Sequence, residues 1–137
     1  MENKRKTSKM KFKIKNHIIG LKRTFVIAEV GNNHNGDFDR AILMIDKAIE
    51  IGADCVKFQM RNIKEVYRSK SLIKSGEDLG TEYIIDLLEK FELSVAQQKK
   101  LSNYCKSNGI TYMCTPWDNK SIDILETFDV PAYKVAS

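Results

Sequence analysis

The chain has 137 residues, of which 42% are hydrophobic and 30% charged, a composition typical of a globular protein of about one domain. No stretch is long and apolar enough to cross a bilayer, which excludes a transmembrane helix and predicts no membrane partner. The basic N-terminus is not followed by the apolar region and cleavage site of a signal peptide, so none is predicted.

The net charge of +5 belongs to the N-terminal arm. Of the 23 bases and 18 acids in the chain, nine bases and one acid lie within residues 1–23, so the remainder carries 14 bases and 17 acids, a net charge of −3. We expect residues 1–10 to form a disordered basic tail that could touch nucleic acid or anionic lipid nonspecifically. No aromatic residues interleave with its basic cluster, so no specific nucleic-acid partner is predicted.

Three cysteines, Cys55, Cys105 and Cys114, form an odd set without Cys-x-x-Cys spacing. This pattern favours reduced thiols in a cytoplasmic protein, packed as small hydrophobic side chains. The chain has only two histidines, His17 and His34, so no zinc-type cluster is predicted.

The expected elements alternate between strands and helices. Residues 12–20 predict a short hairpin, and the apolar run Phe25–Val30 predicts a strand buried on both sides. Helical spacing follows from Phe38 to Ile49, with Asp37 as the N-cap and Gly52 after the end. The remaining expectations begin with a strand over 55–60, an irregular charged segment over 61–80 and a helix over 83–91. A further helix is expected from its N-cap Ser94 to Gly109, followed by a strand over 110–114. Residues 115–118, with Pro116, predict the connection to a short helix around 122–126, and a last strand begins at 130–137.

This order predicts parallel strands joined by right-handed crossovers. Two closed solutions fit, an open doubly wound sheet and a (β/α)8 TIM barrel. No Gly-x-Gly-x-x-Gly motif follows the first strand, which argues against a dinucleotide site. A barrel needs about 250 residues, so the chain would supply about half of one. The sequence stops within the strand expected at 130–137, so residues 11–137 predict the incomplete N-terminal portion of a domain.

Polar side chains within apolar strands are candidates for chemistry because a buried charge is costly unless it is paired or ligated. Glu29 lies near the end of the first strand, Lys57 and Gln59 share one side of the second, and Lys134 interrupts the last. In a barrel, Lys57 and Gln59 would point into the mouth, where two cations and a carboxylate suit an anionic substrate. Alternatively, Glu29 forms a structural ion pair with Lys57 or Lys134.

Other polar residues favour local roles. We expect His34 to pack or cap locally rather than bind a metal, and Asn33, Asn35 and Gly36 to form a turn. Asp118 is expected to cap the helix that follows it. The stripe of Tyr83, Leu87 and Phe91 predicts core packing.

Four segments together resemble the N-acetylneuraminate (sialic acid) synthase family. They are FVIAEVGNNHNG at 25–36, GADCVKFQ at 52–59, CTPWD at 114–118 and VPAYKVAS at 130–137. The resemblance implies the N-terminal half of a (β/α)8 TIM barrel, preceded by the short hairpin. It also implies a phosphoenolpyruvate-dependent transferase that forms a carbon–carbon bond with N-acetylmannosamine or a related N-acylated hexosamine, giving a nonulosonic acid and phosphate.

The resemblance also assigns site residues. Glu29 matches an active-site glutamate, Lys134 and Ser137 match phosphoenolpyruvate contacts, Gln59 matches a position near the sugar, and Asp78 matches an acidic sugar contact. A divalent metal, Mn²⁺ or Mg²⁺, is expected for the whole enzyme, with its ligands outside this chain. The catalytic glutamate that follows the last motif also lies outside it. We therefore expect residues 1–137 alone to be inactive, and the whole enzyme to be a cytoplasmic homodimer.

Two alternatives remain at this point. The sugar could be one that yields legionaminate or pseudaminate. Outside enzymes, the chain could be a non-catalytic binding or assembly module that acts through its basic arm.

Overall fold

The computed structural model describes residues 12–20, 23–66 and 79–136. The expected basic tail of residues 1–10 lies outside them. The elements in chain order are β1 (Phe12–Ile14), β2 (His17–Ile19), β3 (Ile27–Gly31), α1 (Phe38–Glu50), β4 (Cys55–Met60), α2 (Ile63–Val66), α3 (Leu79–Phe91), α4 (Val95–Ser107), β5 (Thr111–Pro116) and α5 (Asn119–Glu126).

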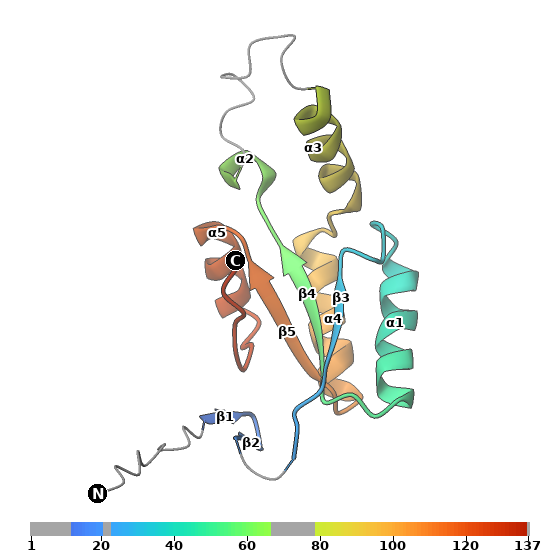
Figure 1. Cartoon of the computed structure of the whole chain (residues 1–137), viewed down its shortest axis with the longest axis vertical. Helices are drawn as coiled ribbons and strands as arrows, with labels where there is room; N and C mark the ends of the chain where they lie inside the picture. Colours follow the sequence, from blue (N-terminus) through green and yellow to red (C-terminus); the bar gives the residue numbers. More distant parts are fainter. Residues whose placement is uncertain (1–11, 21–22, 67–78, 137) are drawn as a thin grey trace, which may run out of the picture.

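The centre of the molecule is a parallel sheet in the order β3-β4-β5, as Figure 1 shows. Glu29 of β3 pairs with Lys57 of β4, which pairs with Met113 of β5. The separate strands β1 and β2 pair antiparallel, with Phe12 opposite Ile19. The predictions of a parallel α/β fold and of an N-terminal hairpin are therefore confirmed for the described residues.

One face of this sheet carries the main hydrophobic core. The β4 side chains Val56, Phe58 and Met60 alternate onto that face, and helices α1, α4 and α5 contribute Ile45, Leu101 and Leu125, among others. In Figure 1 these helices flank and lie behind the three strands. Burial of the apolar stripe of each helix against the strands is the main term that stabilises such a layer.

A buried polar pair is satisfied within that core. Tyr112 donates its hydroxyl proton to Gln98 Oε1 over 2.7 Å, and Gln98 Nε2 donates to the carbonyl of Gln59 over 3.0 Å. The network ties α4 to β4 and β5, and burial raises the pKa of Tyr112 well above its usual value.

The expected caps set the helix boundaries. Asp37 accepts from Arg40 N at 3.0 Å, and Asp118 accepts from Ser121 N at 2.8 Å. Ser94 and Gln97 form a capping box at the start of α4. Gly52 follows α1 with a φ of 74°, a conformation that favours glycine. The N-caps Asp37, Ser94 and Asp118 confirm the sequence predictions.

The hairpin closes the lower end of the sheet, on the face away from the helices. Ile14 packs with Cys55 and Met113 in a second buried cluster. Beside it, Asp54 accepts from Val26 N over 2.8 Å and from Arg23 Nη2 over 2.5 Å. In Figure 1 the hairpin lies below the strands, at the amino ends of β4 and β5.

The C-terminal segment differs from the prediction. The strand expected at 130–137 is reduced to a single bridge, in which Tyr133 lies parallel to Cys114 and Lys134 N donates to Cys114 O over 3.4 Å. Pro131 offers no N–H to a ladder, and the described residues place no strand on the far side of this segment. The boundaries of β3 and β5 also lie later than expected. No helix within the described ranges is long and apolar enough to cross a membrane.

Candidate functional site

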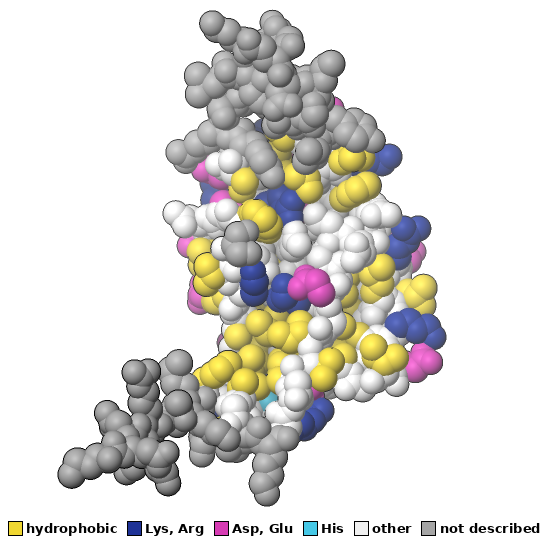
Figure 2. Space-filling view, viewed as in Figure 1, with side chains coloured by type: hydrophobic (Ala, Val, Ile, Leu, Met, Phe, Trp, Pro, Cys, Tyr) yellow, Lys and Arg dark blue, Asp and Glu magenta, His cyan; other side chains and the backbone are white. Residues whose placement is uncertain are grey.

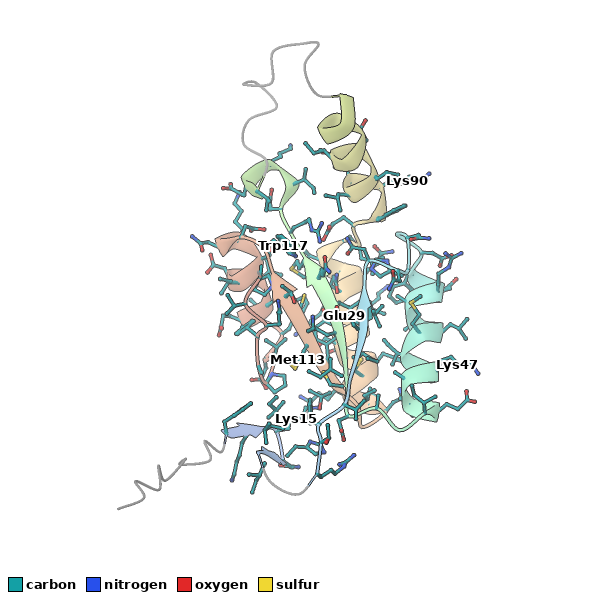
Figure 3. All side chains as sticks on the ribbon, viewed as in Figure 1. Lys15, Glu29, Lys47, Lys90, Met113 and Trp117 are labelled. Carbon is teal, nitrogen blue, oxygen red and sulfur yellow. The ribbon has the colours of Figure 1, made fainter. Side chains whose placement is uncertain are left out.

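The sheet face away from the helices, called the open face here, is apolar at its lower end and polar at its upper end. The strand register aligns Ile27 with Cys55 below, and Glu29, Lys57 and Met113 in the layer above. Gln59 and Thr115 form the next layer, at the carboxyl ends of the strands. Figure 3 shows Glu29 and Met113 over the middle of the sheet, and Figure 2 shows acidic and basic side chains side by side above an apolar patch.

An ion pair lies at the centre of the open face. Lys57 Nζ contacts Glu29 Oε2 and lies 3.4 Å from Thr115 Oγ1. The Lys57 side chain is only 10% exposed, whereas that of Glu29 is 54% exposed. Adjacent parallel strands bring the two residues together, so the pairing that the sequence left open is formed with Lys57. The ammonium is thus held in place while the carboxylate remains accessible.

Gln59 lies beside Glu29, above a glycine. A Cβ placed on Gly31 would lie 3.3 Å from Gln59 Nε2 and 3.6 Å from Glu29 Oε1. Gly31 has a φ of 52°, and the β3–β4 register shifts between Glu29 and Gly31. A larger residue would be strained and would press on the amide, so glycine leaves room for both polar groups.

Arg61 is buried immediately after β4. Its Nη2 donates to Gln59 Oε1, and its guanidinium carbon lies 4.9 Å from the centre of the Trp117 ring. Arg61 Nε lies 3.9 Å from Glu92 Oε2, and Arg61 N donates to Glu92 Oε1 over 3.2 Å. Burial raises the pKa of Glu92 to about 7, although the Arg61 hydrogen bond and charge act in the opposite direction.

The structure brings some of the predicted site residues together and leaves others unplaced. Glu29 and Gln59 converge on the upper end of the open face. The hydroxyl of Tyr133 donates to Glu126 Oε1 of α5, and Lys134 N donates to Cys114 O of β5 over 3.4 Å, so the backbone of Lys134 lies beside β5. Asp78 and Ser137 lie outside the described residues.

His34 has a local role. The ring is buried, Nδ1 accepts from Gly36 N over 3.1 Å, and burial lowers its pKa. Because the Gly36 N–H donates to Nδ1, Nδ1 itself carries no proton. This hydrogen bond confirms the expected local role of His34. The described residues contain no group of three His, Cys, Asp or Glu side chains that could hold a metal ion.

The cysteines are inert packing residues, as predicted. All three are buried, and burial raises the pKa of each thiol to about 12. The thiolate is the nucleophilic form, so none is suited to covalent chemistry at neutral pH.

Two residues of the site, Arg61 and Thr115, were missed by the sequence analysis. Arg61 begins the segment that the sequence predicts to be irregular and charged, and one more basic residue there does not indicate a functional site. The sequence predicts that Thr115 lies in the connection after the strand. The observed β5 extends to Pro116, which carries Thr115 onto the open face opposite Gln59.

Comparison with known proteins is consistent with this geometry. The NeuB family model matches residues 44–137, more than half of the chain. The chain belongs to the NeuB family. It is 35% identical over 121 residues to the N,N'-diacetyllegionaminic acid synthase of Campylobacter jejuni, covering 85% of this chain and 36% of that protein. It is 36% identical over 116 residues to the N-acetylneuraminate-9-phosphate synthase of Mus musculus, covering 82% of this chain and 32% of that protein.

The fold of this NeuB-family chain is also found in a solved relative. The N-acetylneuraminic acid synthetase of Leptospira borgpetersenii, solved in complex with citrate, is 27% identical, with a TM-score of 0.78. The match covers 93% of this chain and 41% of that one. The chain spans about a third of the length of the curated relatives that it matches.

Proposed function

We propose that the chain forms the first part of the (β/α)8 barrel of a synthase that condenses phosphoenolpyruvate with an N-acylated hexosamine to give a nonulosonic acid and phosphate. The observation that carries this proposal is the accessible Glu29 carboxylate, which pairs with Lys57 and lies beside Gln59 in the half of the open face towards the carboxyl ends of the parallel strands. Enzymes with this barrel place their sites at that end. Membership of the NeuB family supports the reaction class.

In this proposal, the cations of the open face receive phosphoenolpyruvate. Lys57 is held by Glu29 and Thr115, so its ammonium is oriented before a ligand arrives. An ammonium donates strong charge-assisted hydrogen bonds to phosphate or carboxylate oxygens. Lys134 would add a second cation and Ser137 a hydroxyl donor, as the family motif implies.

Glu29 and Gln59 would act on the sugar side. The Glu29 carboxylate is accessible and can accept a proton or a hydrogen bond from a hydroxyl group or a water molecule. Gln59 contributes an amide to the same space. Asp78 remains a proposed sugar contact on the resemblance alone.

The described residues do not fit the divalent metal that the family implies. Glu29 is paired with Lys57, and these residues offer no group of three metal-ligating side chains. No step of the proposed chemistry in this chain is therefore assigned to a metal.

The sugar is the part of the proposal with several candidates. The relatives include synthases of N-acetylneuraminate 9-phosphate, N,N'-diacetyllegionaminic acid and pseudaminic acid. All three names fit condensation with an N-acylated sugar, so the substrate class is proposed rather than one sugar. The alternative of a binding module rests on the basic arm, and no observation on the described residues favours it.

The test is phosphate release from phosphoenolpyruvate with each candidate sugar, by the complete synthase polypeptide that carries this segment. Wild type should release phosphate with one sugar and form the matching nonulosonic acid, and Glu29→Gln should lose most of that activity. Phosphate release that Glu29→Gln leaves unchanged would contradict the site. The 137-residue chain alone is expected to release none.

A further inference from the structure

The orientation of the Gln59 side chain is fixed by a neighbour outside the family motif. A guanidinium carries only hydrogen-bond donors, so the Gln59 atom that Arg61 Nη2 contacts must be the carbonyl oxygen, Oε1. The Nε2 group then points the other way, towards Gly31, where a Cβ would lie 3.3 Å from it. Within the part of the chain that the structure describes, Nε2 makes no hydrogen bond.

Arg61 is itself held on several sides. Trp117 N donates to the carbonyl of Met60 over 3.0 Å, and Asn62 N donates to Asp118 Oδ2 over 2.6 Å. These bonds fix the backbone on each side of Arg61, and its own N–H is taken by Glu92. The Arg61 side chain is 5% exposed, and its guanidinium lies over the Trp117 ring. A long side chain normally loses conformational entropy when it forms a hydrogen bond. The Arg61 side chain is already restricted by these contacts, so its hydrogen bond to Gln59 costs less entropy.

We propose that Arg61 is a positioning residue that occupies Gln59 Oε1, so that Gln59 presents only its N–H donors to a ligand on the open face. The group that Gln59 receives is then an acceptor oxygen, such as the N-acyl carbonyl or a hydroxyl oxygen of the hexosamine. The identity of this ligand rests on the proposed function, whereas the orientation of the amide does not.

The orientation can be tested on the 137-residue chain by nuclear magnetic resonance. The Gln59 side-chain amide is assigned by its loss in Gln59→Met. In wild type, its protons should show nuclear Overhauser contacts to Gly31. In Arg61→Met these contacts should be lost, because the amide can rotate, while the exposed control Lys64→Met should keep them. Contacts to Trp117 instead of Gly31 in wild type, or unchanged contacts in Arg61→Met, would overturn the proposal.

The functional consequence is tested by kinetics of the complete synthase. Loss of one oriented hydrogen bond should raise the KM for the sugar about 10-fold in Arg61→Met and leave the KM for phosphoenolpyruvate unchanged. Gln59→Glu keeps an acceptor for Arg61 but has no donor, so it should raise the same KM, and it remains informative if Arg61→Met does not fold. An unchanged sugar KM in Gln59→Glu, or equal changes in both KM values in Arg61→Met, would contradict the assignment.

The proposed function and the proposed role of Arg61 are tested by different measurements. If the wild-type polypeptide releases no phosphate with any sugar, the proposed function is wrong, and the Overhauser contacts still decide the orientation. If wild type is active but the contacts do not depend on Arg61, only the positioning role is wrong.

Discussion

The two faces of the parallel sheet carry different side chains, although the same strands build both. Towards the helices, β4 presents Val56 and Phe58, which are completely buried in the main core. Towards the open face, it presents Lys57 and Gln59 beside the accessible Glu29. Because neighbouring residues of a strand point to opposite faces, one short segment can serve packing and ligand chemistry without either compromising the other.

The largest effect on stability is expected on the helix-covered face. Phe58→Ala removes a ring that is completely buried and lies 5.6 Å from the ring of Tyr112. We expect the free energy of unfolding in urea to fall by about 3–5 kcal/mol, the usual cost of a large core deletion. The matched control is Leu43→Ala on the exposed side of α1, which should cost much less. A loss in Phe58→Ala no greater than in that control would mean that this face is not the main core.

The second-largest loss of stability is expected at the lower end of the open face. Asp54→Ala leaves Val26 N and Arg23 without their carboxylate, next to the hairpin that covers this end. We expect the free energy of unfolding to fall by about 2–3 kcal/mol, because two hydrogen bonds to a charged, buried carboxylate are lost. Asp39→Ala in the first turn of α1 is the exposed control. Equal stability of Asp54→Ala and wild type in thermal denaturation would show that these hydrogen bonds of Asp54 do not stabilise the fold.

A smaller effect, dependent on pH, is expected from Glu92. Its pKa is raised to about 7, so the folded state binds a proton that the unfolded state releases near its ordinary value of 4.5. The stabilisation from the protonated form is therefore complete below about pH 4.5 and is lost as the pH rises through 7. Relative to Glu92→Gln, the unfolding free energy of wild type should fall by about 2 kcal/mol between pH 4.5 and 8. Parallel pH profiles of the two proteins would show that Glu92 does not titrate in this range.

The smallest effect on stability is expected in the middle of the open face. Glu29→Gln removes one partner of an ion pair whose acidic side chain is 54% exposed. The amide oxygen of glutamine can still accept a hydrogen bond from the Lys57 ammonium, which is only 10% exposed. We therefore expect the free energy of unfolding in urea to fall by no more than about 1 kcal/mol. A loss as large as that of Phe58→Ala would assign Glu29 a structural role and weaken the contrast between the two faces.

Local features of this chain could be predicted from the sequence because they depend on neighbouring residues. Asp37, Ser94 and Asp118 cap their helices from three residues away, and the alternation of β4 separates Lys57 and Gln59 from Phe58. Glu29 and Gln59 could also be anticipated, because a charge or amide in an apolar strand needs a partner.

The tertiary structure alone decided which of these groups meet. Arg61, Glu92 and Trp117 come from three separate parts of the chain, and only the parallel crossovers bring them around Gln59. The same holds for the choice of Lys57 as the partner of Glu29, which follows from the β3–β4 register. The segment after Val130 had the composition of a strand but formed only one bridge, because a strand is completed by hydrogen bonds from its neighbours and not by its own sequence.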